Sequence, residues 1–101
     1  MKKKYSKAQI KTAFELRNEG MKLFSCGKYR ESISFFNKAL KVIPDFQWCL
    51  YNKGEAFLHL DKFEEAVEAF NEAIEIFPDG YSLRYRNLAL ECINFLKAKR
   101  G

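Results

Sequence analysis

The fold is decided by residues 47–80, which read QWCLYNKGEAFLHLDKFEEAVEAFNEAIEIFPDG. The preceding stretch, residues 13–46, reads AFELRNEGMKLFSCGKYRESISFFNKALKVIPDF and aligns with it without a gap. Ten of the 34 aligned positions are identical, and at least six more keep an apolar residue in both units. A fixed period of this length is typical of a solenoid, in which each unit buries its apolar face against its neighbours.

Each unit predicts two helices separated by a short turn. In residues 47–80 the apolar residues have helical spacing up to a break at Asp61-Lys62, and after it they recur at steps of three and four. Proline cannot continue a helix and pushes the preceding residue to extended geometry, so the second helix is expected to end at Pro78-Asp79-Gly80. The first unit repeats this pattern, with its turn at Gly27-Lys28 and its end at Pro44-Asp45.

Gly20 and Gly54 occupy the same position in the two units, in the middle of the first predicted helix of each. Glycine inside a helix costs about 1 kcal/mol relative to alanine. Its presence in both units predicts that the second helix crosses there, too close for a β-carbon. We expect Ala39 and Ala73 to serve the next contact between the helices for the same reason.

The pattern formed by these residues closely resembles the tetratricopeptide repeat. The second unit carries it in Leu50, Gly54, Phe57, Ala66, Phe70, Ala73 and Pro78, and the first unit in Leu16, Gly20, Leu23, Phe36, Ala39 and Pro44. Ser32 stands where the family usually has alanine. The resemblance implies an all-α fold in which antiparallel helix-turn-helix repeats stack as a short right-handed α–α superhelix.

One further helix is expected after the two repeats. Residues 81–99 carry a continuous apolar stripe formed by Tyr85, Leu88, Ala89, Cys92, Ile93 and Leu96. With the same period, Leu88 falls on the glycine position. The resemblance identifies this segment as a capping helix. We therefore expect five helices in four segments: a basic extension (1–12), repeat 1 (13–46), repeat 2 (47–80), and the capping helix with a basic tail (81–101).

In the family, the first helix of each repeat lines a concave groove that holds a ligand peptide. The resemblance therefore implies a partner-binding site made of Phe14, Arg17, Asn18, Met21, Trp48, Tyr51, Asn52, Glu55, Tyr85 and Arg86. Four more residues extend this lining, namely Ser25, His59, Ser82 and Ala89. Aromatic and arginine residues are the types that anchor peptides, although packing between helices is a competing role for the aromatic ones.

One subfamily binds the terminal carboxylate of acidic chaperone tails through two asparagines and three basic residues. Arg17, Asn52 and Arg86 fall on three of these positions. Met21 replaces the other asparagine and Ser82 replaces a lysine, so the full set is absent. Two kinds of ligand therefore stay open: a generic peptide, and an acidic or carboxyl-terminal segment.

The sequence predicts a protein-interaction module and not an enzyme, because no acid or base lies beside a nucleophile in a recognisable pattern. The alternative is a self-assembling structural protein that forms a homo-oligomer through the groove or the last helix. Leu83, Leu90 and Phe95 lie beside or off the stripe of that helix and favour this alternative. Cys26, Cys49, Cys92 and His59 have no zinc-ligand spacing, so no metal or cofactor is expected.

The net charge of +5 arises from 18 basic and 13 acidic residues. Eight of the basic residues lie in the two flanks, residues 1–11 and 97–101, which contain no acidic residue. No nucleic-acid partner is expected, since a phosphate-binding face would cluster lysine and arginine within the fold. No apolar run is long enough to span a membrane, and no signal-peptide pattern begins the chain, so we expect a cytoplasmic protein.

Overall fold

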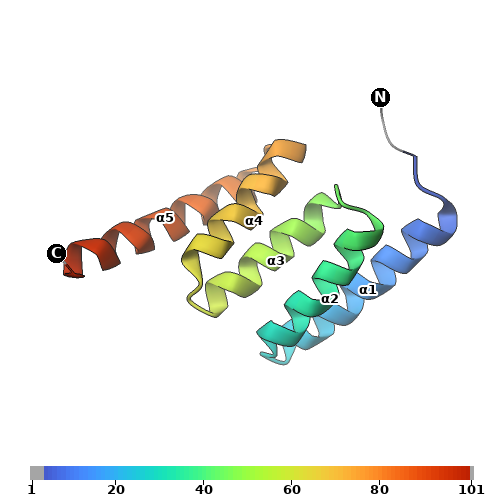
Figure 1. Ribbon diagram of the computed structural model, residues 1–101, viewed down its shortest axis with the longest axis horizontal. Coiled ribbons are helices and arrows are strands. Elements are labelled where there is room, and N and C mark those ends of the chain that lie inside the picture. Colours follow the sequence, from blue (N-terminus) through green and yellow to red (C-terminus); the bar gives the residue numbers. More distant parts are fainter. Residues whose placement is uncertain (1–3, 101) are drawn as a thin grey trace.

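The computed structural model describes residues 4–100, which form five helices and no strand (Figure 1). The helices are α1 (Lys7–Ser25), α2 (Tyr29–Val42), α3 (Gln47–His59), α4 (Phe63–Ile76) and α5 (Gly80–Arg100). The predicted all-α fold of five helices is confirmed. Within this range no helix has both the length and the hydropathy needed to cross a membrane. Lys2 and Lys3, part of the predicted basic extension, and Gly101 lie outside the described residues.

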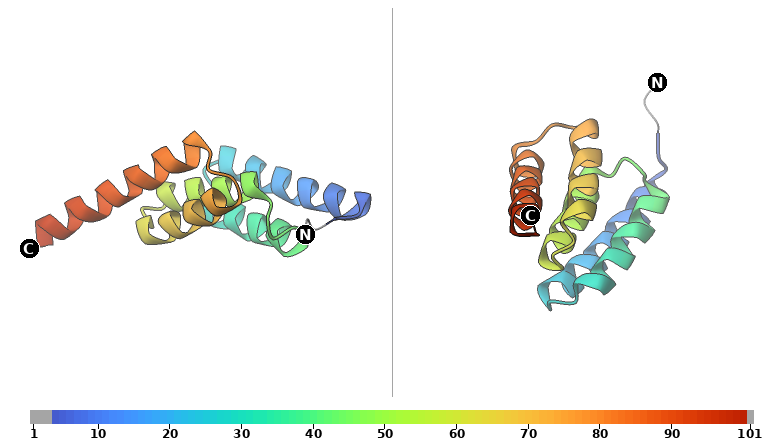
Figure 2. Two further views of the ribbon diagram at one scale, coloured as in Figure 1. Left: turned by 90° about the horizontal axis from the view of Figure 1, so that it is seen from above. Right: turned by 60° about the vertical axis from the view of Figure 1, so that its left-hand side comes forward.

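The helices form two layers in an elongated slab of 51 × 34 × 18 Å. Helices α2 and α4 form one layer, and α1, α3 and α5 form the other (Figures 1 and 2). Each helix packs against the next one in the chain, and α3 also touches both α1 and α5. The second layer is therefore a continuous face built from the first helix of each repeat and the last helix.

The two mid-helix glycines lie where paired helices cross, as predicted. A β-carbon on Gly20 would lie 2.6 Å from Cε1 of Phe36, and one on Gly54 would lie 2.5 Å from Cε1 of Phe70. Both phenylalanines are fully buried. Because these glycines have no β-carbon, the backbone of α1 can approach α2 closely, and the backbone of α3 can approach α4 in the same way.

The turns inside the two repeats match each other. Gly27 (φ 77°) and Asp61 (φ 57°) are equivalent residues, and both adopt a left-handed backbone conformation. Glycine has no β-carbon to oppose this conformation, and aspartate tolerates it better than most residues do. The matching geometry lets α2 and α4 begin at equivalent residues, Tyr29 and Phe63.

Helix α5 departs from the repeat. Helix α3 begins at Gln47, and the repeat period makes Tyr81 the residue equivalent to Gln47. Helix α5 nevertheless begins one residue earlier, at Gly80. The buried residues of α3 and α5 are related by a spacing one residue shorter than the 34-residue repeat, which we name the shorter spacing. On this spacing Ser82 and Ala89, fully buried on α5, match Cys49 and Ala56, fully buried on α3. An α-helix turns by about 100° per residue. The side chains of α5 therefore point in directions different from those that the repeat period predicts.

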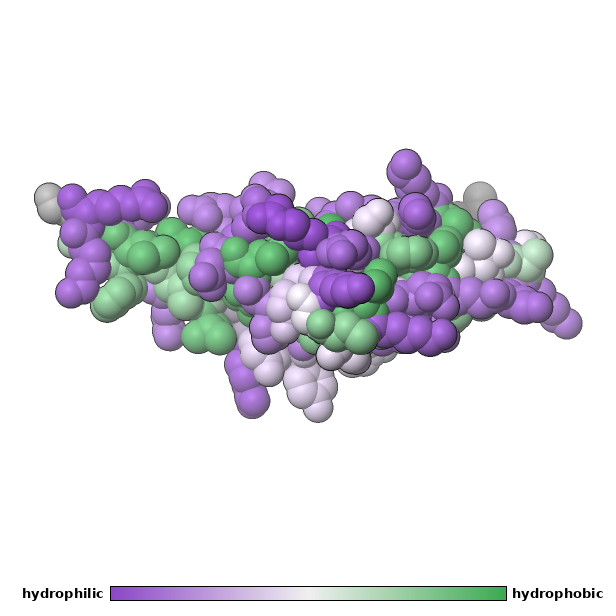
Figure 3. Space-filling view, turned by 90° about the horizontal axis from the view of Figure 1, so that it is seen from below, coloured by the Kyte–Doolittle hydropathy of each residue, from purple (hydrophilic) through white to green (hydrophobic). Residues whose placement is uncertain are grey.

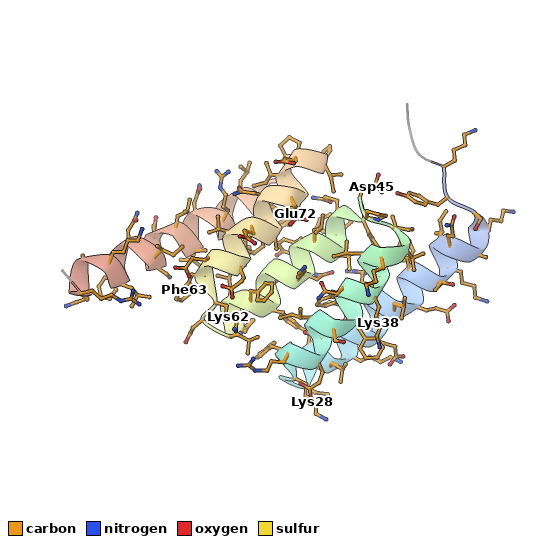
Figure 4. The ribbon with its side chains drawn as sticks, in the orientation of Figure 1. Lys28, Lys38, Asp45, Lys62, Phe63 and Glu72 are labelled. Carbon is orange, nitrogen blue, oxygen red and sulfur yellow. The ribbon has the colours of Figure 1, made fainter. Side chains whose placement is uncertain are left out.

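The connections before α3 and α5 explain this shift. Asp79 caps α5, since its Oδ1 accepts the backbone N–H of Ser82 at 2.8 Å, while its Oδ2 accepts a hydrogen bond from the side chain of Gln47. The matching Asp45, in the connection between α2 and α3 (Figure 4), accepts the Tyr5 hydroxyl at 2.7 Å and does not cap α3. Helix α5 therefore begins one residue earlier in its repeat than α3 does.

A side chain holds the start of α3 in its place. Phe46 is the N-cap residue of α3, and its ring packs against that of Phe14 with centroids 4.9 Å apart. Gly80 follows Pro78-Asp79 at the position matching Phe46, and it has no side chain with which to make this contact. The first turn of α5 is thus fixed by the aspartate cap, and that of α3 by an aromatic contact with α1.

Candidate functional site

The candidate binding surface is the face formed by α1, α3 and α5, which we name the α1–α3–α5 face. Phe14 of α1 and Trp48 of α3 lie near the same end of this face, and each is 47% exposed. Trp48 packs edge-on against Tyr51, with ring centroids 5.8 Å apart. Aromatic rings that remain half-exposed beside other aromatic rings offer a large contact area at little entropic cost, which is typical of binding surfaces.

A hydrogen-bonded set of three polar residues joins α1 to α3. Arg17 Nε donates to Asn52 Oδ1 at 2.7 Å, and Asn52 Nδ2 donates to Glu55 Oε1 at 3.3 Å. Asn52 is only 4% exposed, so its amide is used inside the protein. The bond to Asn52 uses only the Nε of Arg17 and fixes the plane of the guanidinium, whose Nη groups suit a carboxylate.

Tyrosines form the junction between α3 and α5. The ring of Tyr51 lies 6.2 Å from that of Tyr81 and 6.1 Å from that of Tyr85, between centroids. Burial raises the pKa of Tyr51, and the negative charge of Glu55 raises it further. The Tyr51 hydroxyl is therefore a hydrogen-bond donor at neutral pH. Tyr81 is 57% exposed and was not among the residues that the sequence predicted for the site.

The early start of α5 changes which of its side chains reach this face. Ser82 and Ala89 were expected to line it, but both are fully buried, so this expectation is wrong. On the shorter spacing Tyr85 matches Asn52 of α3, and Arg86 matches Lys53. The Arg86 guanidinium donates to Asn71 of α4 and to the neighbouring Asn87, both at 3.3 Å. Arg86 is thus held toward α4 and does not take the position on α5 that matches Asn52.

Two atoms of α5 are buried without a hydrogen-bond partner among the described residues, namely Ser82 Oγ and Arg86 Nε. An unpaired guanidinium N–H is more costly to bury than an unpaired hydroxyl, because it belongs to a charged group. The Nη bonds to Asn71 and Asn87 still satisfy part of the Arg86 charge. Arg86 is therefore a residue of the α4–α5 contact.

The remaining predicted residues have different surroundings. Asn18 is exposed beside a shallow depression formed by α1 alone, together with Glu15 and Lys22. Met21 is partly buried and packs against the core cluster that contains Phe36. His59 is exposed and stacks on Tyr29, with ring centroids 4.5 Å apart and planes at 6°. Asn18 and Asn52 are equivalent in sequence, but their surroundings differ, because Asn52 accepts a hydrogen bond from Arg17 of the preceding repeat and is buried, whereas Asn18 is exposed.

The cysteines are unpaired and differ in exposure. Cys26 is exposed, Cys92 is partly buried, and Cys49 is buried with its Sγ 3.4 Å from the carbonyl oxygen of Phe36. Burial raises the pKa of the Cys49 thiol to about 12. Among residues 4–100, no group of three or more histidine, cysteine, aspartate or glutamate residues is arranged to hold a metal ion.

Two residues of this face, Tyr81 and Leu88, were not predicted from the sequence, because the repeat period was carried into the last helix. On the shorter spacing they match Trp48 and Glu55 of α3. The signal that could have revealed them was the residue after Pro-Asp, which is Phe46 before α3 and Gly80 before α5. A glycine there removes the contact that delays the start of α3.

Known sequences and structures agree on the repeat. Family models described as "Tetratricopeptide repeat" match residues 18–46 and 48–79, which together make up more than half of the chain. No curated protein sequence matches the chain. The second TPR of Spaghetti (RPAP3), solved with the HSP90 peptide SRMEEVD, is 22% identical with a TM-score of 0.82, over 91% of this chain and 88% of that one.

Two further solved structures are similar. The first TPR of Spaghetti (RPAP3), solved with the same peptide, is 26% identical with a TM-score of 0.79, over 87% of this chain and 72% of that one. The Arabidopsis OM64 TPR domain is 19% identical with a TM-score of 0.82, over 88% of this chain and 74% of that one. With its repeated units, its glycine–phenylalanine crossings and these matches, the chain belongs to the tetratricopeptide repeat family.

Proposed function

We propose that the chain is a protein-interaction module whose α1–α3–α5 face binds a segment of another protein. One observation carries the proposal: three aromatic side chains remain about half exposed on this face, and an arginine lies among them. Phe14, Trp48 and Tyr81 are the aromatic residues, and Arg17 is the arginine. Aromatic and arginine side chains carry much of the binding energy in protein interfaces.

For the ligand we propose an extended peptide with a carboxylate that meets Arg17. The hydrogen bond from Arg17 Nε to Asn52 holds the guanidinium in one orientation, so little side-chain entropy is lost when a ligand binds. Glu55 is the competing negative charge on this face, and its carboxylate accepts a hydrogen bond from Asn52. The first TPR of Spaghetti, 26% identical to this chain, supports the choice because its structure contains an acidic HSP90 peptide.

The test is a calorimetric titration of the protein with the peptide SRMEEVD and with the same peptide amidated at its carboxyl terminus. We expect the free-acid peptide to bind and amidation to weaken binding by roughly tenfold, the effect of losing one charge-assisted pair. Arg17→Gln should weaken binding of the free acid and leave the amide unchanged. Equal affinity of both peptides for both proteins would exclude a carboxylate contact at Arg17.

The general proposal has a separate test. Trp48→Ala should reduce binding of a peptide that lies across Phe14, Trp48 and Arg17, because it removes the largest exposed ring there, while Phe77→Ala is the matched control. Phe77 is 62% exposed at the end of α4, outside the α1–α3–α5 face. If partners captured from a cell extract were recovered equally by wild type and Trp48→Ala, the face would not be the binding surface.

A further inference from the structure

The outer half of α5, with the first residue of α4, carries a partly exposed apolar surface distinct from the residues around Trp48. Its members are Phe63, Leu88, Cys92, Phe95 and Leu96, which together line an open depression of about 400 Å³, and we name this set the α5 shelf. Phe95 is 61% exposed. Figure 3 shows hydrophobic side chains gathered over this end of the molecule, and Figure 4 shows Phe63 at the start of α4 beside α5.

The shelf does not lie on the side of α5 where a following repeat helix would pack. On α3, that side contains Leu50, Gly54 and Phe57. Their matches on the shorter spacing are Leu83, Asn87 and Leu90, and the same side of α5 also contains Asn94. This side is half polar, as expected for a capping face. The shelf residues that lie on α5 instead follow Tyr81 and Tyr85 at steps of three and four, so they continue the α1–α3–α5 face beyond the end of α3.

The charges carried by α5 are mostly positive. Helix α5 has five basic residues and a single acidic one, Glu91, which lines the same depression as the shelf residues. Arg84 precedes Leu88 by one turn, and Lys99 places its Nζ 5.5 Å from the centre of the Phe95 ring. Within residues 4–100, no basic side chain of α5 forms an ion pair.

The remaining basic residues near the shelf already face acidic ones. Lys97 and Arg100 share a second, more polar depression with Asp61 and Glu64. Arg84 and Lys99 both lie on α5, at a separation of about 22 Å along the helix axis. They therefore flank the α5 residues of the shelf at both ends, and we name the stretch of α5 between them, about four turns long, the apolar strip.

A second copy of this chain is the less suitable occupant. Antiparallel pairing of two α5 helices about Cys92 would bring Arg84 of one copy next to Arg100 of the other, and parallel pairing would bring each basic residue next to itself. Like charges placed opposite each other reduce the affinity. The acidic helix α4 cannot serve as the partner helix either, since its apolar side is buried against α3 and α5.

We infer that the α5 shelf docks an amphipathic helix of another protein, with an apolar ridge of about three turns and acidic residues at both ends. The apolar ridge packs on Leu88, Cys92 and Phe95, and the acidic ends pair with Arg84 and Lys99. This surface adjoins the residues around Trp48, but the inference does not depend on a ligand being bound there.

The test uses a fluorescein-labelled peptide of about 18 residues, long enough to span the strip as a helix. Its leucines recur at steps of three and four, and glutamates flank them at both ends. Fluorescence anisotropy is measured against the full chain. We expect saturable binding that weakens as salt is raised, and a loss of roughly tenfold or more in affinity for Phe95→Ala. A peptide with lysines in place of the glutamates should bind more weakly by a similar factor.

Three variants act as controls. Phe77→Ala removes an equally exposed phenylalanine far from the shelf and should leave the affinity unchanged. Trp48→Ala should also leave the affinity for this peptide unchanged, which distinguishes the shelf from the proposed binding site around Trp48. Lys99→Gln should reduce the salt dependence. Circular dichroism of each variant checks that the helices are intact, and no folding defect is expected because each of these side chains is about half exposed or more.

Each other outcome overturns the inference. Absence of saturable binding to wild type would exclude the docking site. Equal affinity for the lysine peptide would show that Arg84 and Lys99 do not select acidic residues. Loss of binding in Trp48→Ala would show that the peptide binds around Trp48 and not on the shelf. If light scattering showed a dimer that Phe95→Ala dissociates, a second copy would be the occupant.

Discussion

Oδ1 of Asp79 and the backbone nitrogen of Ser82 lie 2.8 Å apart, and this hydrogen bond fixes the first turn of α5. The equivalent Asp45 bonds instead to the hydroxyl of Tyr5, on the segment that precedes α1. Two aspartates in the same Pro-Asp sequence thus have different roles. One caps a helix, and the other ties the N-terminal segment to the connection between α2 and α3.

Removing the cap should destabilise the last helix. For Asp79→Ala we expect the free energy of unfolding to fall by about 1 kcal/mol, the usual effect of losing an N-cap side chain. Urea denaturation followed by circular dichroism measures this change. Asp79→Asn is the matched control, since asparagine caps nearly as well, and a loss as large as that of alanine would show that the cap is not the stabilising feature.

Adding a methyl group at the helix crossing should also be destabilising. In Gly54→Ala the new β-carbon would lie 2.5 Å from Cε1 of the buried Phe70. We expect the free energy of unfolding to fall by about 1–3 kcal/mol from overpacking, partly offset by about 1 kcal/mol of helix propensity. Urea denaturation again provides the measurement.

Gly80→Ala is the control for that substitution, because the added β-carbon would have no atom within 4 Å beyond its own helix backbone and chain neighbours, and the φ of Gly80 is not in the left-handed region. Its stability should be unchanged or slightly raised. Equal destabilisation of both variants would mean that the contact with Phe70 does not limit the site.

The buried thiol of Cys49 should make stability depend on pH at the alkaline end. Its pKa is raised from the ordinary 9.0 to about 12. Above pH 9 the unfolded chain loses this proton while the folded chain keeps it, so the free energy of unfolding falls as pH rises toward 12. Denaturation midpoints of wild type and Cys49→Ala are compared between pH 8 and pH 11.

Wild type and Cys49→Ala should differ in how steeply their free energy of unfolding falls with pH. Cys49→Ala should be less stable at pH 8 because of the small cavity, but its stability should fall less steeply above pH 9. Parallel pH profiles would contradict a perturbed Cys49. Thiol labelling gives an independent check: at pH 8, Cys26 should react rapidly and Cys49 should not react until the protein unfolds.

Arg17 and Asn52 should be energetically coupled. Single and double alanine variants define a cycle, and we expect a coupling free energy of about 1–2 kcal/mol, since the bond involves a charged donor and lies partly buried. Thermal or urea unfolding of the four proteins measures it. Additive effects of the two substitutions would show that this hydrogen bond contributes nothing to the α1–α3 contact.

The sequence predicted the fold because each determining feature acts locally. The turns at Gly27 and Asp61 and the helix ends before Pro44 and Pro78 depend on neighbouring backbone geometry, and the crossing at Gly54 depends on the size of one residue. The direction of α5 depends instead on a competition between two residues: an aspartate that caps, and an aromatic ring that packs on another helix. The repeat period of the sequence does not predict which of these two interactions determines where α5 begins.

The candidate site was predictable only where it follows the repeat. Phe14 and Trp48 are exposed on the expected face, although their binding role stays a prediction. The pairing of Arg17 with Asn52 depends on the rotamers of two long side chains, which the sequence does not specify. Ser82 and Ala89 were misplaced by the one-residue shift, and Tyr81 was missed for the same reason.

The early start of α5 means that the length of a connection selects a binding surface. Inserting one residue between Phe77 and Gly80 would rotate α5 by about 100° and bury a different set of its side chains, without altering any residue of the helix. In short arrays of this kind, recognition can therefore diverge through a single-residue insertion or deletion. Engineers who graft residues between such proteins must match the length of the connection as well as the side chains.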